Sequence, residues 1–170
     1  WGIEWGARGD AWNPDELRPT VVRDALSQRF VGGWHDKYPA MHYIALGLPL
    51  VAFETADRRL PLPPEPMDAH VAQVLVTRLV STLLGLGALA AAFVCGAELF
   101  GARRAVLAPL ALLLTPLFVF YGKLANLDVP SPCWFGWALV GFLRVVRGGA
   151  RGAYILLGAA LTALGCWASG

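Results

Sequence analysis

Two adjacent acids followed by a cation form the most informative polar motif of the chain. The motif is Asn13-Pro14-Asp15-Glu16-Leu17-Arg18, and Lys37 follows in the same polar region. A carboxylate can take the proton of an attacking hydroxyl, while cations such as Arg18 and Lys37 can balance the charge of a departing phosphate. The motif is also typical of a helix start, because Asn favours the N-cap and Pro favours the first helical position. Both interpretations stay open on these residues alone.

A second motif, His35-Asp36-Lys37-Tyr38-Pro39, comes directly before an apolar stretch. His35 and Asp36 could contribute to a metal site, but no His or Cys spacing typical of such sites accompanies them. Pro39 is equally a helix-start signal. The motif therefore indicates a metal site only weakly.

The third feature is Asp128, which lies in the segment Tyr121–Pro130 between two apolar stretches. An acid at the edge of a membrane helix is costly unless it is solvated or paired, so a functional role is the first hypothesis. The alternative is a solvated acid paired with Lys123. We expect Tyr38, Tyr121 and Lys123 to lie near the candidate site in either case.

The composition indicates whether the chain is a soluble protein or a membrane protein. Of the 170 residues, 56% are hydrophobic and 15% are charged, whereas about a quarter of the residues of a soluble domain are charged. The formal net charge of +2 and the scattered basic residues argue against a nucleic-acid partner. The sequence therefore predicts an integral membrane protein.

The elements expected to position the motifs are all helical. We predict a polytopic transmembrane helical bundle, all-α, with four spanning helices over about 73–99, 105–122, 129–145 and 152–170, since these stretches approach the ~30 Å of hydrocarbon. Residues 1–70 are predicted to form an outer-face region with juxtamembrane helices over about 14–29 and 39–53 and a Pro-rich connector. Arg78, near the outer end of the first span, is interpreted as a snorkelling residue.

The arginines between the predicted spans set the orientation. Arg103 and Arg104 separate the first two spans, and Arg144, Arg147 and Arg151 separate the last two. The positive-inside rule places both of these loops in the cytoplasm, so the polar motifs face outside. The apolar stretch 39–53 is assigned to the outer surface, with a spanning helix as the rival.

Five short motifs occur in a fixed order, and nearly the whole chain takes part. They are Pro14-Asp15-Glu16, Lys37-Tyr38-Pro39, Arg78-Leu79-Val80-Ser81, Leu99-Phe100-Gly101 and Asp128-Val129-Pro130. This ordered set resembles the bacterial family 39 membrane glycosyltransferases of the C-type fold, which are related to protein O-mannosyltransferases and lipid A aminoarabinose transferases. Tyr38 departs from the pattern, because many members have a proline there.

The resemblance implies a glycosyltransferase that moves a sugar from a polyprenyl-phosphate lipid to an acceptor hydroxyl. The reaction is expected at the periplasmic or extracellular face of a bacterial inner or plasma membrane. Asp15 is implied to be the base, with Glu16 beside it and Asp128 as a further catalytic acid. Arg18 and Lys37 match positions that contact the donor phosphate.

The resemblance also places Asp36, together with His35, where a divalent metal can bind, although the sequence does not require one. The family's first spanning helix and C-terminal domain are expected outside this chain at its two ends, and the isolated fragment is expected to be inactive. The sugar and the acceptor are not identified. Two alternatives remain, a transporter or channel subunit and a non-catalytic membrane scaffold, and the scarcity of polar residues in the spans argues against the transporter.

Overall fold

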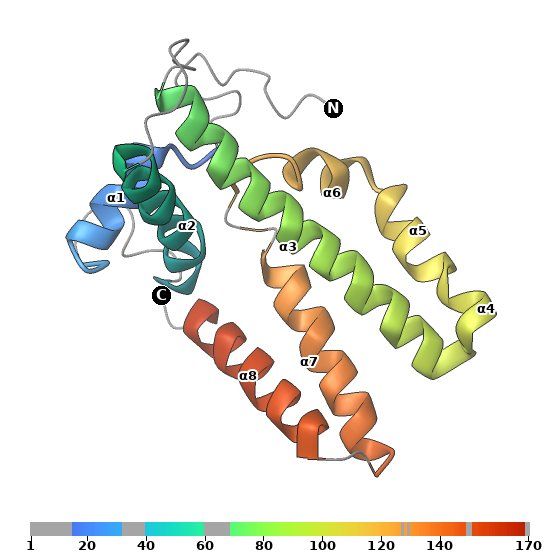
Figure 1. The fold of residues 1–170 in the computed structure, drawn as a ribbon. Helices are drawn as coiled ribbons and strands as arrows, with labels where there is room; N and C mark the ends of the chain where they lie inside the picture. Colours follow the sequence, from blue (N-terminus) through green and yellow to red (C-terminus); the bar gives the residue numbers. More distant parts are fainter. Residues whose placement is uncertain are drawn as a thin grey trace.

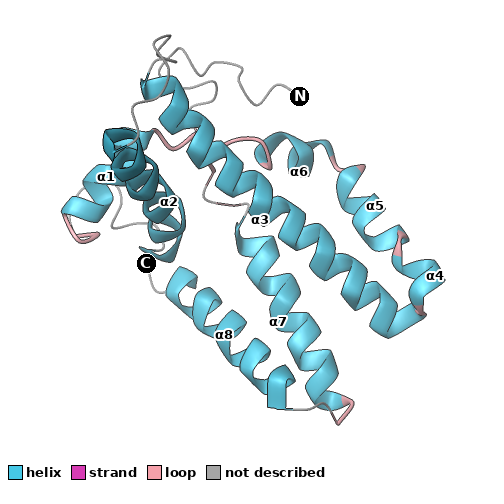
Figure 2. Cartoon of the chain, viewed as in Figure 1, coloured by secondary structure: helices cyan, strands magenta, loops and turns pink. Residues whose placement is uncertain are grey.

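The regular secondary structure is helical throughout the part of the chain that the structure describes (Figure 2). The structure is a computed structural model and describes residues 15–31, 40–59, 69–126, 128, 130–148 and 151–168. Its helices are α1 Pro19–Ser27, α2 Ala40–Arg59, α3 Ala69–Phe100, α4 Ala102–Ala105, α5 Leu107–Leu113, α6 Pro116–Tyr121, α7 Pro130–Val146 and α8 Arg151–Ala168. The expected all-α class is confirmed.

Helix α3 is the central helix, against which α1, α2, α4, α5 and α7 pack, while α8 packs against α7 (Figure 1). It has 32 residues and is, among the described helices, the one that is long and apolar enough to cross a membrane, judged by length and composition. Its buried side is polar or small, with Arg78, Ser81, Gly85 and Ala88. Its exposed side carries leucines at positions 79, 83 and 86, each more than half exposed. This arrangement inverts the pattern of a helix on the surface of a soluble protein.

The second predicted span, 105–122, is not one helix. After Gly101, which has a positive φ of 82°, the chain runs through the short helices α4, α5 and α6. The break before α6 falls at Thr115, which is extended because the ring of Pro116 disfavours the helical region for the preceding residue. The segment nevertheless returns along α3, as Figure 1 shows.

Helices α7 and α8 begin and end within a few residues of the last two predicted spans. The contacts of α7 with α3 and with α8 run through small residues. A Cβ built on Gly136 would lie 2.8 Å from the Cβ of Ala91 on α3, and one built on Gly141 would lie 2.8 Å from the backbone nitrogen of Leu157 on α8. Small residues at these positions let the helix backbones approach closely, as in membrane helix pairs.

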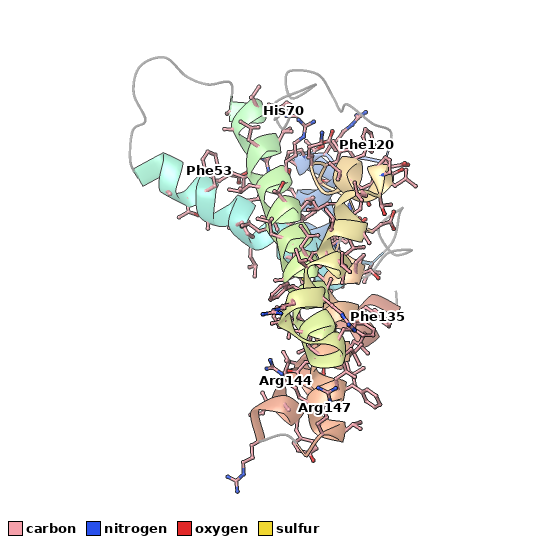
Figure 3. The ribbon with its side chains drawn as sticks, turned by 90° about the vertical axis from the view of Figure 1, so that its right-hand side faces the viewer. Phe53, His70, Phe120, Phe135, Arg144 and Arg147 are labelled. Carbon is pink, nitrogen blue, oxygen red and sulfur yellow. The ribbon has the colours of Figure 1, made fainter. Side chains whose placement is uncertain are left out.

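Helices α1 and α2 pack at the N-terminal end of α3. Figure 3 shows α2 running across the direction of α3 rather than alongside it. The predicted first juxtamembrane helix, 14–29, begins later than expected, at Pro19, with Arg18 extended before it. The physical reason is that Pro19 has no N–H to donate and restricts the preceding residue, so it opens a helix rather than continuing one. Val22 and Ala25 on this helix, together with Leu17 just before it, are buried in the core.

The close contact between α7 and α8 predicts a stability difference between two glycines. Gly141→Ala would push its methyl group into the backbone of Leu157, so we expect a loss of about 1–3 kcal/mol in unfolding free energy. Gly158→Ala is the matched control, because no atom lies within 4 Å of its added Cβ. It should leave stability unchanged or raise it by up to about 1 kcal/mol. Unfolding of both variants in detergent measures the difference, and equal stabilities would contradict the packing.

Candidate functional site

A buried ion pair joins the segment before α1 to α3. The Nε of Arg78 donates to Oε1 of Glu16 at 2.5 Å, and its Nη2 donates to Oε2 at 2.8 Å. The Arg78 side chain is fully buried and that of Glu16 is 3% exposed. The snorkelling interpretation of Arg78 was therefore wrong, because its guanidinium faces a carboxylate inside the protein. A two-point contact of this kind is among the strongest hydrogen-bonded pairs in proteins.

The sequence carries a signal for the burial of Arg78. Thr77, Arg78, Ser81 and Thr82 form a polar group on a mostly apolar helix. An ionisable residue within an apolar helix usually faces the protein interior and is paired. The partner could not be read locally, since Glu16 lies 62 residues earlier in the chain.

The neighbouring acid, Asp15, has a different environment. Asp15 is exposed, and the hydroxyl of Tyr121 donates to its Oδ2 at 3.4 Å. Tyr121 ends α6, so the end of the return segment reaches the residues before α1. Two adjacent carboxylates thus differ in what they can do. Glu16 is engaged by a cation at both oxygens, while Asp15 can meet a molecule from outside.

The loop after α6 is fixed to both α3 and the segment before α1. The backbone N–H of Leu17 donates to the carbonyl of Ala125 at 2.7 Å. The hydroxyl of Thr82 lies 3.1 Å from the carbonyl oxygen of Gly122, within hydrogen-bonding distance. These contacts hold the loop at the same end of α3 as Asp15.

Asp128 is exposed, and its backbone position is set by a buried amide. The Asp128 N–H donates to Oδ1 of Asn126 at 2.6 Å, and Asn126 is 2% exposed. Lys123 and Asp128, both among the described residues, form no ion pair with each other. The alternative that Asp128 is a solvated acid paired with Lys123 is therefore not observed. Asp128 therefore stays a candidate for chemistry.

A buried histidine lies against the same loop. His42, on the first turn of α2, is 2% exposed. Burial lowers the pKa of His42 to about 4, and a contact with the Asn126 backbone opposes this shift in part. The imidazole is therefore neutral near pH 7 and adds no cation to the site.

The remaining predicted site residues are divided between the described and undescribed parts. Arg18 is exposed at the start of α1. The predictions for His35, Asp36, Lys37 and Tyr38 lie outside the described residues. Within the described part, no group of three or more His, Cys, Asp or Glu side chains could hold a metal ion. The structure thus brings Asp15, Glu16 and Tyr121 together and fixes Asp128 on the adjoining loop.

Comparisons with protein-family models, curated proteins and solved structures give no significant match.

The buried ion pair predicts an asymmetric response to mutation. Arg78→Met removes the two-point contact of a guanidinium with the buried Glu16 carboxylate, so we expect a loss of about 3–5 kcal/mol in unfolding free energy. The double variant Glu16→Met/Arg78→Met should recover much of that loss, since no buried charge remains. Unfolding in detergent for both single variants and the double variant gives the coupling energy.

Arg23→Met is the matched control, because Arg23 pairs with Glu54 where the two side chains are 39% and 24% exposed. An exposed pair contributes about 0–1 kcal/mol. A loss for Arg78→Met no greater than that for Arg23→Met would show that the buried pair is not a determinant of stability.

Proposed function

We propose that this chain is part of a membrane glycosyltransferase of the C-type fold, which transfers a sugar from a polyprenyl-phosphate donor to an acceptor hydroxyl at the outer membrane face. One observation carries the proposal: of two adjacent acids, Glu16 is neutralised by Arg78 in the interior, while Asp15 is exposed beside Tyr121. An exposed carboxylate that is held in position by a buried anchor is able to act as a general base. The order of motifs in the sequence supports the same class.

The proposed reaction assigns one step to each group. Asp15 takes the proton of the acceptor hydroxyl as the acceptor oxygen bonds to the anomeric carbon. The bond between that carbon and the phosphate oxygen breaks, and the phosphate leaves with the electron pair. Arg18 and Lys37 balance the phosphate charge. Asp128 is the second acid at the site, and Glu16 acts only by holding Asp15 in position through Arg78.

The surface of the helices supports a membrane location for the whole bundle. Large apolar side chains are at least about half exposed on α5, α6, α7 and α8, among them Leu107, Leu117, Phe135, Phe142 and Ile155. Soluble proteins rarely expose so many along successive helices. We therefore propose that the segments over α4–α6, α7 and α8 cross the membrane with α3, while α2 lies at the outer surface.

The orientation is tested with reporters that are active only in the cytoplasm. A reporter fused after Gly149 should be active, because this turn follows Arg144 and Arg147 on the cytoplasmic side. The same reporter fused after Asn126 should be inactive, since that loop belongs to the proposed outer site. The reverse pattern would place the site in the cytoplasm and remove the proposal.

The base is tested with Asp15→Asn in the full-length enzyme. The amide keeps the size of the side chain but cannot accept the proton, so turnover should fall by roughly 10²–10⁴-fold with donor binding largely retained. Asp24→Asn is the matched control, since Asp24 is an exposed acid on α1 outside the site. Lys37→Ala should weaken donor binding as well as turnover.

Donor binding and sugar transfer are measured separately in nanodiscs. Near-normal turnover of Asp15→Asn would exclude Asp15 as the base and leave Asp128 as the candidate, because Glu16 is engaged by Arg78. Unchanged cellular function after loss of both exposed acids would instead favour the scaffold alternative.

A further inference from the structure

The end of α3 opposite the proposed site carries a concentration of arginines. Figure 3 shows Arg144 and Arg147 at this end, away from Phe120 and His70. We call it the arginine end, and it consists of Arg103 and Arg104 on α4, Arg144 on α7, Arg147 just after α7, and Arg151 at the start of α8. All five are exposed.

One carboxylate at this end orders two of the arginines. Glu98, on the last turn of α3, accepts from Nε of Arg144 and from Nη1 of Arg147, both at 3.1 Å. The two arginine side chains remain 47% and 50% exposed. Each guanidinium has five N–H donors, so most of their donors are not used by Glu98. Glu98 is also the one acid among the described residues of α3 through α5.

The other arginines have no counterion in the described part of the chain. Arg103 and Arg104 follow Gly101, whose positive φ of 82° turns the chain sharply at the end of α3. No ion pair forms between either of them and a described acid. The arginine end therefore presents an excess of guanidinium donors that matches the oxygens of a phosphate.

The same end is surrounded by exposed apolar side chains. Phe100 and Leu107 are 65% and 61% exposed on either side of α4, and Val146 is 67% exposed beside Arg147. A free phosphate would gain nothing from these side chains, whereas the acyl chains of a lipid would cover them. The combination of cations and an apolar surround indicates an anionic lipid.

We propose that the arginine end binds the phosphate headgroup of anionic glycerophospholipids in the membrane leaflet opposite the proposed site. Arg103 and Arg104 supply charge, and the Glu98 contacts hold Arg144 and Arg147 in position for the same headgroups. The site is separate from the proposed donor site and does not depend on glycosyl transfer.

The test uses the chain in an uncharged detergent at low ionic strength, with dioctanoyl phosphatidylglycerol as the probe. Arg104→Gln should weaken its binding about 5-fold and Arg103→Gln/Arg104→Gln about 30-fold, as expected for the contribution of each basic residue near a lipid surface. Both variants should fold, because neither arginine has a partner to lose among the described residues. The control is Arg29→Gln, because Arg29 is exposed and lies just after α1, at the other end of the molecule from the arginine end. This substitution should change lipid binding by less than about 2-fold.

Two further probes separate the sources of phosphate. Dioctanoyl phosphatidylcholine, which has the same chains and no net charge, should bind much more weakly, and glycerol phosphate should not compete. Equal binding of the two lipids, or unchanged binding to the double variant, would overturn the proposal. Competition by glycerol phosphate at the affinity of the lipid would assign the arginine end to a soluble phosphate instead.

Discussion

The burial of Glu16 with Arg78 is the contact on which the arrangement of the candidate site depends. Either charge alone would be costly to bury. The two are stable in the interior because Arg78 donates two hydrogen bonds to the Glu16 carboxylate. The pair fixes the segment before α1 against α3. Leu17, the next residue, can then bond to Ala125, and this contact fixes the loop after α6 as well. The pair therefore determines where both exposed acids lie.

The return segment from Gly101 to Gly122 completes this arrangement. It runs back along α3 until the carbonyl of Gly122 lies near Thr82, one helical turn beyond Arg78. The breaks between α4, α5 and α6 do not prevent that return, because α5 and α6 still lead back toward the N-terminal end of α3 (Figure 1). As a result Tyr121 reaches Asp15, and Asn126 sets the backbone of Asp128 at the same end. Residues more than 100 positions apart in the chain become neighbours.

The two ends of α3 differ in how their charged side chains are paired. At the N-terminal end, a buried carboxylate is matched by a guanidinium, and a second carboxylate stays exposed. At the C-terminal end, the Glu98 carboxylate pairs with two arginines, and the other arginines there have no counterion among the described residues. The partners that we propose for the two ends differ accordingly. We propose sugar transfer at the first end and anionic lipid headgroups at the second.

The sequence by itself determined the helical class and the positions of α3, α7 and α8 within a few residues, because long apolar stretches bounded by arginines and glycines have few other solutions. It also marked Asp15 and Asp128 as polar residues at the ends of such stretches. Only the tertiary structure decided which acid is buried, since Glu16 and Asp15 are adjacent and chemically alike. The partner of Glu16 lies on another helix 62 residues away, and no local pattern identifies such a pair. The late start of α1 at Pro19 and the break before Pro116, in contrast, follow from the local geometry of proline, which is readable from the sequence.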